Sequence, residues 1–377
     1  MGKRVVSIVL NNFKNDSRVL KENISLQKAG YDVQVVALHE EPLEEFEAIE
    51  NIPVHRLKLK SRNWSKNRLI QVLKYLEFIY LVVKKYKRTD IIHCNDLNAL
   101  PVGVIIKNFF NREVKIVYDA HEYETEINGL KGFQKSLVKK LEKLLIKYAD
   151  KVITVSDSIA NEYVKLYGIE KPALVLNTPP YKKIESRNIF RETLGIKHKQ
   201  TIFLYQGGLS EGRGIETLLG AFKILDNRFV IVFMGYGVLE ELVQIASQEN
   251  SNIYFHKAVS PDILLDYTSS ADFGISTIED TCLSYRYCLP NKMFEYTMAE
   301  LPVIASNLYE MKRLVEAEKI GIVAEENSSE GLKKVIKKAL LLDRKELLRN
   351  IKKAKSYYHW QEQEKVLLKV YKNLYAN

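Results

Sequence analysis

The residues best suited to binding a phosphorylated ligand form a glycine-rich loop in the second half of the chain. A predicted strand at residues 201–205 leads into residues 207–214, which hold four glycines and Arg213. Glycines let backbone amides approach a ligand, the following helix start offers unpaired N–H groups, and arginine adds a forked donor. The loop matches neither the Walker nor the GxGxxG pattern, so a tight strand-to-helix turn without ligand is the alternative.

A second glycine pair, Gly235 and Gly237 around Tyr236, follows the apolar run at residues 229–234. In open α/β sheets, ligands bind outside the carboxyl ends of strands, so both glycine turns indicate one shared crevice. Taken alone, this second turn needs no ligand to explain it.

The segment that begins at Pro290 carries the most specific chemistry. Proline and asparagine favour a helix start, so amides near Asn291 would face the same phosphates, with Lys292 as a point charge. Glu295, one turn further on, presents a carboxylate that only accepts hydrogen bonds, which suits two vicinal hydroxyls such as those of a ribose. A solvated helix residue is the alternative for Glu295.

Polar residues also follow strands in the first half of the chain. His121 follows a strand predicted at residues 114–118, and His93 and Asp96 lie at the end of a shorter one. These residues would line a site at the carboxyl edge of the sheet. A structural hydrogen-bonding role is the alternative for a histidine in this position.

Alternating strands and helices predict two parallel sheets that position these residues. The strands of the first half are expected at residues 5–10, 32–37, 91–92, 114–118 and 151–155. A proline-containing stretch at residues 177–191 interrupts the pattern, which then resumes with strands at residues 201–205, 229–234, 253–255, 273–276 and 303–305. The expected domains are residues 1–183 and 184–356, followed by a C-terminal helix in residues 357–377 that crosses back to the first domain.

Five segments, in chain order, resemble the retaining glycosyltransferases of family 4, which have the GT-B fold. They are VYDAHE, DKVITVS, QGGLSEGRGIETLLGAF, MGYG and the NKMFEYTMAELPVIA helix and strand. The resemblance spans residues 4–306. It implies two Rossmann-like α/β domains facing each other across a cleft. It also implies transfer of a hexose-type sugar from a nucleoside diphosphate to an acceptor hydroxyl, with retention of configuration.

The resemblance also implies roles for single residues. His121 and Glu295 would be catalytic, with His121 at the donor sugar and Glu295 at the nucleotide ribose. The donor and its phosphates would be held by Gly207, Gly208, Arg213, Gly214, Gly235, Tyr236, Val259, Asn291 and Lys292. Tyr287 departs from the family pattern, because a second glutamate is common at that position.

The loop after the first strand would face the acceptor in this fold. It carries Asp16 and Arg18, which are suited to hydroxyls or phosphate, and Asp96 would lie on the same side. A helix-capping Asp16 followed by a solvated Arg18 is the alternative.

Charge that builds on the departing diphosphate would be stabilised by loop amides, Arg213, Lys292 and a helix dipole. The sequence has no DxD motif and no residues with metal-ligand spacing. We therefore expect no metal and no cofactor, only a donor such as a UDP- or GDP-sugar. A sugar-nucleotide epimerase or an inverting transferase on the same fold remains an alternative.

The net charge of +10 over 377 residues is concentrated in the first half. Residues 133–148 predict an amphipathic helix with Lys135, Lys139, Lys143 and Lys147 opposite its leucines. Either the apolar face packs on the sheet, or the lysines rest on an anionic membrane while the site takes a lipid-linked acceptor. Nucleic acid is a third class of partner, but the sequence contains no recognisable nucleic-acid-binding motif.

The N-terminus lacks the apolar region of a signal peptide, and the longest apolar stretch, residues 69–83, is interrupted by charges. Three cysteines without a CxxC pair indicate reduced thiols. We therefore expect a cytoplasmic protein, peripheral on the inner face of the plasma membrane. Through the family resemblance, capsule, lipopolysaccharide or other polysaccharide biosynthesis is the expected setting.

Overall fold

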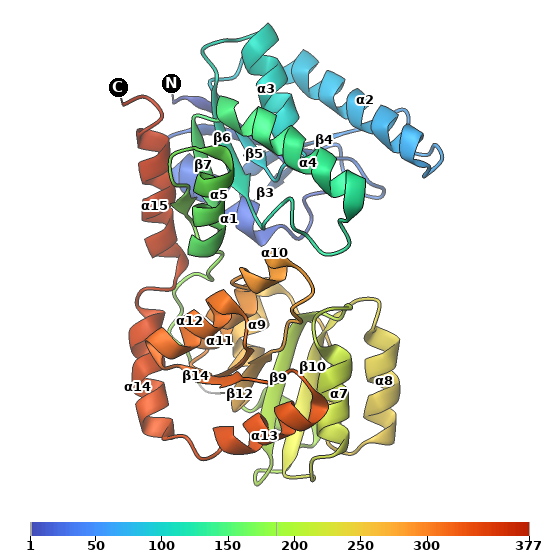
Figure 1. The fold of residues 1–377 in the computed structure, drawn as a ribbon, viewed down its shortest axis with the longest axis vertical. Coiled ribbons are helices and arrows are strands. Elements are labelled where there is room, and N and C mark those ends of the chain that lie inside the picture. Colours follow the sequence, from blue (N-terminus) through green and yellow to red (C-terminus); the bar gives the residue numbers. More distant parts are fainter. Residues whose placement is uncertain (1, 186, 377) are drawn as a thin grey trace. The chain divides into compact units, whose positions relative to one another are not determined.

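The computed structural model describes residues 2–185 and 187–376 (Figure 1). The chain divides into two compact units, one running to Val175 and resuming at Glu364, and the other comprising Leu176–Gln363. The boundary lies before the predicted residue 183. The reason is that the linker is bound to the second unit: Trp360 N donates to the Pro179 carbonyl at 2.8 Å, and Tyr181 N donates to Gln361 Oε1 at 3.0 Å.

The described residues of the first unit form an eight-stranded sheet in the order β3-β4-β2-β1-β5-β6-β7-β8, parallel except for the β3–β4 pair. Its strands are β1 (Arg4–Ile8), β2 (Asp32–Leu38), β3 (Phe46–Ile49), β4 (Ile52–Leu57), β5 (Ile91–Asn95), β6 (Lys115–Ala120), β7 (Lys151–Thr154) and β8 (Ala173–Leu174). Its helical segments are α1 (Ser17–Lys28), α2 (Arg68–Tyr86), α3 (Leu100–Phe109), α4 (Gly132–Leu145), η1 (Ile146–Tyr148) and α5 (Asp157–Tyr167).

The described residues of the second unit form a six-stranded parallel sheet in the order β11-β10-β9-β12-β13-β14. Its strands are β9 (Thr201–Gly208), β10 (Phe229–Tyr236), β11 (Ile253–Lys257), β12 (Phe273–Ser276), β13 (Val303–Ser306) and β14 (Gly321–Ala324). Its helices are α6 (Ile189–Leu194), α7 (Ile215–Lys223), α8 (Glu240–Glu249), α9 (Pro261–Thr268), α10 (Leu283–Arg286), α11 (Asn291–Met298), α12 (Tyr309–Glu318), α13 (Ser329–Ala339) and α14 (Arg344–Lys355).

Local sequence explains why these elements begin and end where they do. The central strands are continuous apolar runs because helices cover both faces of the sheet, and residues 230–233 of β10 are fully buried. Helix α5 begins after Ser156, whose hydroxyl accepts from Ile159 N, and ends at Gly168 in the left-handed conformation. The expected strands form, most of them with shifted ends, whereas β3, β4, β8 and β14 have no counterpart among the predicted strands.

The last helix, α15 (Trp360–Lys372), belongs to both units. Trp360 is buried at its start, and the Tyr371 hydroxyl lies 2.6 Å from His93 Nδ1 in the first unit. The segment from Glu364 therefore returns to the first sheet, as the sequence predicted. Among the helices of the described chain, none has the combination of length and apolarity that crossing a bilayer requires.

Candidate active site

The glycine-rich loop of the second unit leaves β9 in backbone conformations that favour glycine. The φ angles of Gly207, Gly212 and Gly214 are +112°, +75° and +75°. A Cβ on Gly214 would lie 2.0 Å from the Thr277 carbonyl oxygen, so the start of α7 needs glycine for packing as well. Gly207 and Gly208 are exposed, whereas Gly212 and Gly214 are buried, so only the first part of the loop keeps its backbone accessible.

The second glycine turn packs directly against the first. A Cβ on Gly235 would lie 1.9 Å from the Gly207 carbonyl oxygen, and one on Gly237 would lie 2.3 Å from that of Leu209. Tyr236 is exposed at the end of β10. The two turns lie together at the carboxyl edge of the sheet, as predicted, and these close approaches also give both glycines a structural role.

Two cations lie beside this loop and contact aromatic rings. Lys292, in the first turn of α11, is buried with Nζ 3.6 Å from the ring centroid of Tyr205. Arg213 lies over Tyr285, with its guanidinium carbon 4.8 Å from the ring centroid. Burial, together with the charge of Arg213, lowers the pKa of Lys292 to about 7. An anion placed between these groups would restore the charge of the lysine.

Glu295 is partly buried one turn further along α11, rather than freely solvated. Gln206 Nε2 donates to its Oε2 at 2.5 Å, and Thr268 Oγ1 donates to Gln206 Oε1 at 2.8 Å. The backbone N–H of Gln206 is bound in turn by the hydroxyl oxygen of Tyr296, at 3.1 Å. This series of hydrogen bonds orients the carboxylate of Glu295. The sequence assigned no role to Gln206, although it lies in the glycine-loop motif.

The remaining donor-side residues lie at the same sheet edge. Gly208 ends β9 with its backbone exposed, and Asn291 is exposed at the start of α11. Pro290 is the N-cap residue of α11 and has no side-chain acceptor to satisfy the first amides of the helix. Val259 is half-buried after β11, where it packs against the core.

His121 follows β6 in the first unit and lies between two carboxylates. Its Nε2 lies 3.1 Å from Asp119 Oδ2, and its Nδ1 lies 3.3 Å from Asp96 Oδ1. Although burial opposes protonation, Asp119 and Asp96 raise the pKa of His121 to about 9. The imidazole is therefore a cation at neutral pH, able to donate hydrogen bonds but not to act as a base.

The structure corrects the expectations for Arg18. The side chain is 4% exposed, and it neither faces an acceptor nor is solvated. Its Nε and Nη2 donate three hydrogen bonds to the Asp119 carboxylate, and its Nη1 donates to the Val175 carbonyl at 2.7 Å. A fully buried carboxylate needs a counter-charge, which Arg18 supplies. Asp16 caps α1 by accepting from Val19 N, as the alternative predicted.

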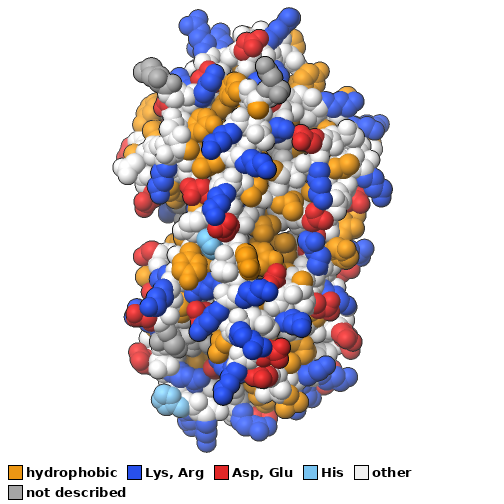
Figure 2. Space-filling view, turned by 90° about the vertical axis from the view of Figure 1, so that its left-hand side faces the viewer, with side chains coloured by type: hydrophobic (Ala, Val, Ile, Leu, Met, Phe, Trp, Pro, Cys, Tyr) orange, Lys and Arg blue, Asp and Glu red, His pale blue; other side chains and the backbone are white. Residues whose placement is uncertain are grey.

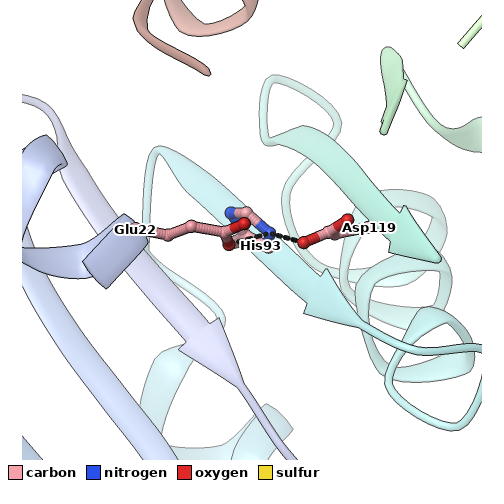
Figure 3. A group of neighbouring side chains, drawn as sticks. All are labelled: Glu22, His93 and Asp119. Atoms are coloured by element: carbon pink, nitrogen blue, oxygen red, sulfur yellow. Dashed lines mark ion pairs between the residues drawn. The ribbon is translucent and has the colours of Figure 1, made fainter. Parts of the chain in front are cut away.

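Glu22 from α1, His93 from β5 and Asp119 from β6 point toward one another inside the first unit (Figure 3). His93 Nε2 lies 3.6 Å from Glu22 Oε2 and 3.7 Å from Asp119 Oδ2. Each residue offers one atom to a potential metal ion, and these atoms all lie within 4.8 Å of one another. The guanidinium of Arg18 already pairs with both carboxylates, at 3.2 Å from Glu22 Oε1 and 2.8 Å from Asp119 Oδ1, so we assign a buried ion-pair cluster. His93 is buried and does not line a surface site.

Helix α4 also differs from the expectation. Its apolar face does not pack on the sheet, because Leu137, Leu141 and Leu144 are exposed. Two of the predicted membrane-facing lysines, Lys135 and Lys139, form ion pairs with Glu126. Lys143 and Lys147 are exposed. The face shown in Figure 2, in contrast, has basic, acidic and hydrophobic side chains interspersed.

Comparisons with known proteins agree with this architecture. A family model described as Glycosyltransferase Family 4 matches residues 24–178, and one described as Glycosyl transferases group 1 matches residues 186–357. The chitobiosyldiphosphodolichol beta-mannosyltransferase of Kluyveromyces lactis is 24% identical over 83% of this chain and 77% of its own. An uncharacterized glycosyltransferase of Methanocaldococcus jannaschii is 26% identical over 67% of this chain and 70% of its own.

Solved structures resemble the whole chain. The sucrose-phosphate synthase from Thermosynechococcus elongatus superposes with a TM-score of 0.81 at 18% identity, covering 99% of both chains. HepE from Anabaena, in complex with UDP and glucose, has a TM-score of 0.76 at 16% identity, also covering 99% of both. The two parallel-sheet α/β units thus have the GT-B fold of these solved structures. The chain belongs to the family 4, or group 1, glycosyltransferases.

Proposed function

We propose that the chain transfers a hexose-type sugar from a nucleoside-diphosphate sugar to an acceptor hydroxyl, with retention of configuration. The observation that carries the proposal is the grouping of Arg213, Lys292 and Glu295 around the β9 loop. The cations and loop amides suit a diphosphate, and the oriented carboxylate of Glu295 suits the hydroxyls of a ribose. HepE, whose solved complexes contain UDP or UDP-glucose, supports a donor of this chemistry.

In the proposed reaction, negative charge grows on the diphosphate as its bond to the sugar breaks. Arg213 donates to its oxygens, Lys292 gains a proton and full charge beside it, and the first amides of α11 add their dipole. These groups supply the stabilisation that a metal ion supplies in other enzymes, so the proposed reaction is metal-independent. His121, as a cation, would donate a hydrogen bond to the donor sugar.

The proposed acceptor is a glycan precursor, lipid-linked or polysaccharide, in the synthesis of a cell-surface glycan such as capsule or lipopolysaccharide. The relative from Kluyveromyces lactis supports a lipid-linked acceptor, because its name records a sugar carried on diphosphodolichol. We propose the inner face of the plasma membrane as the location. The name of that relative also records a β-mannosyl product, which favours an inverting transferase as the second candidate.

The test is turnover of UDP- and GDP-sugars with a lipid-linked acceptor, with the anomeric configuration of the product determined by NMR. We expect retention and unchanged turnover in excess EDTA. Inverted product would support the second candidate. Loss of turnover on chelation, restored by added Mg²⁺ or Mn²⁺, would contradict metal independence.

A further inference from the structure

Helix α4 faces outward with an apolar stripe. Its stripe residues are each 41–82% exposed: Phe133, Leu137, Leu141, Leu144 and Tyr148. Their spacing of three or four places them on one side of the helix, continuing into η1. The buried residue of α4 is instead Glu142. A helix that packs on a protein core normally has the opposite arrangement.

Glu142 shows that this orientation is built into the fold. Its carboxylate accepts hydrogen bonds from three tyrosine hydroxyls: Tyr118 at 2.6 Å, Tyr163 at 2.9 Å and Tyr167 at 2.5 Å. These tyrosines belong to β6 and α5, so they hold the polar side of α4 against the unit. The leucines consequently remain on the outside.

Helix α2 carries a second exposed stripe. Its members are each 47–79% exposed and also recur at helical spacing: Leu69, Val72, Leu73, Leu76 and Tyr80. Residues 68–77 include no buried side chain, and burial along the helix begins only at Phe78. The first half of α2 therefore extends past the core of its unit (Figure 1).

The two helices lie on one side of the first sheet. The connections β4–α2–β5, β5–α3–β6 and β6–α4–β7 all advance in the same direction across the sheet. Right-handed crossovers of this kind place their helices on the same face. Helix α3 contacts both α2 and α4, so the stripes belong to one layer of helices.

The charges around the stripes are positive on the outside. The acidic residues near the stripes interact with other groups of the protein. Glu77 accepts hydrogen bonds from Lys60 N, Ser61 N and Ser61 Oγ. Glu126 forms ion pairs with two lysines, and Glu142 is buried. The exposed basic residues of these segments include Lys66, Arg68, Lys140, Lys143 and Lys147. Trp64, 54% exposed, lies in the loop before α2.

We propose that the α2 and α4 stripes form a membrane-inserting surface for an anionic phospholipid bilayer. Leucines with a basic rim match the boundary between acyl chains and negatively charged headgroups, and tryptophan prefers the same depth. This charge complementarity favours lipid over a second copy of the chain, whose equally basic stripes would repel. The surface differs from the lysine face expected from the sequence, because apolar insertion carries the attachment.

The test is co-sedimentation of the full chain with vesicles of phosphatidylcholine, with and without about 30% phosphatidylglycerol, in the absence of donor and acceptor. We expect binding to the anionic vesicles, a blue shift of Trp64 fluorescence that Trp64→Phe abolishes, and weaker binding in high salt. Two double variants, one in each stripe, should each weaken vesicle binding by about tenfold or more. They are Leu73→Ser with Leu76→Ser in α2, and Leu137→Ser with Leu144→Ser in α4.

The matched control is Leu242→Ser with Leu341→Ser, which changes two exposed leucines of the second unit and should bind as the wild type does. All variants should keep the wild-type melting temperature, because the altered side chains are exposed. Wild-type chain that stays in the supernatant, or stripe variants that bind like the control, would overturn the proposal. So would a dimer in sedimentation velocity that the stripe variants convert to monomer. Because no sugar transfer is measured, these outcomes do not depend on the proposed reaction.

Discussion

Lys292 combines a buried position with a function that needs charge. Its pKa is lowered to about 7 by burial and by the neighbouring Arg213, so near neutral pH a large fraction of the side chain is uncharged. A bound diphosphate would reverse this effect, because an adjacent negative charge favours the protonated amine. At the scale of the residue, donor binding and protonation are therefore linked.

We predict that donor binding takes up a proton between about pH 7 and 8, and that affinity falls as the pH rises above the lowered pKa of Lys292. The affinity should fall by at most about tenfold per pH unit. Calorimetric titration of a UDP- or GDP-sugar in buffers of different ionisation enthalpy measures the uptake. The Lys292→Arg variant should bind the donor without taking up a proton, since arginine stays charged. Equal proton uptake in both proteins would contradict the assignment.

His121 shows the opposite shift and makes a separate prediction. Its pKa is raised to about 9, so its contribution to folding stability is complete below the unfolded value near 6.5 and is lost as the pH rises through 9. Asp96→Asn removes one of the two carboxylates and should lower the pKa of His121 by about one unit. NMR titration of the His121 ring measures the change. An unchanged titration would show that Asp96 does not act on this ring.

At the scale of elements, the polar side of α4 is held by one carboxylate and three tyrosine hydroxyls. Burial raises the pKa of Glu142, and the hydrogen bonds from the tyrosines oppose that shift. The cluster joins α4 to β6 and α5. It stabilises an orientation of the helix that hydrophobic burial alone would reverse.

Removing this anchor should destabilise the fold measurably. We predict that Glu142→Ala lowers the free energy of unfolding by about 3 kcal/mol, because three buried hydroxyls lose their acceptor. Glu142→Gln keeps an acceptor and should cost about half as much. Urea denaturation followed by circular dichroism measures both. Glu330→Ala, at an exposed position on α13, is the control and should change stability by less than about 0.5 kcal/mol. A Glu142→Ala chain as stable as this control would refute the anchor.

Much of the architecture could be predicted from the sequence, because apolar runs and glycine turns are local signals. The strand at residues 273–276 forms as predicted, and the linker follows from its prolines. Three features could not be predicted in this way. The partner of Arg18 is 101 residues away, and Gln206 and Glu295 are 89 residues apart, so neither pairing has a local signal. Periodicity identified the leucine stripe of α4 but not which side faces the protein.

At the scale of the whole molecule, the chain ends in the unit where it began. The segment from Glu364 completes the first unit through Tyr371, whose fully buried hydroxyl contacts His93 at 2.6 Å. The glycosyltransferase fold is thus built from two units with separate sheets, one of which depends on both ends of the chain.

We predict that deletion of residues 364–377 destabilises the first unit, whereas the second unit keeps its structure. A milder change, Tyr371→Phe, should lower stability by about 1–2 kcal/mol, because His93 Nδ1 loses its buried partner. Tyr375→Phe is the matched control, because Tyr375 is 42% exposed and its hydroxyl donates only a long hydrogen bond, of 3.4 Å, to the Asp90 carbonyl. Hydrogen exchange measured peptide by peptide shows where protection of the backbone amides is lost. Unchanged protection of β5 and β6 in the Tyr371→Phe chain would refute this role.

The central claim is that the second unit holds a nucleoside-diphosphate sugar between Arg213, Lys292 and Glu295. The most direct measurement is calorimetric binding of UDP-, GDP- and ADP-sugars to the wild-type chain and to Glu295→Ala, with the exposed Glu241→Ala as control. We predict that at least one donor binds, that Glu295→Ala weakens it by roughly 10- to 150-fold, and that Glu241→Ala does not. Equal affinity in the Glu295→Ala chain, or no binding of any donor to the wild type, would contradict the account.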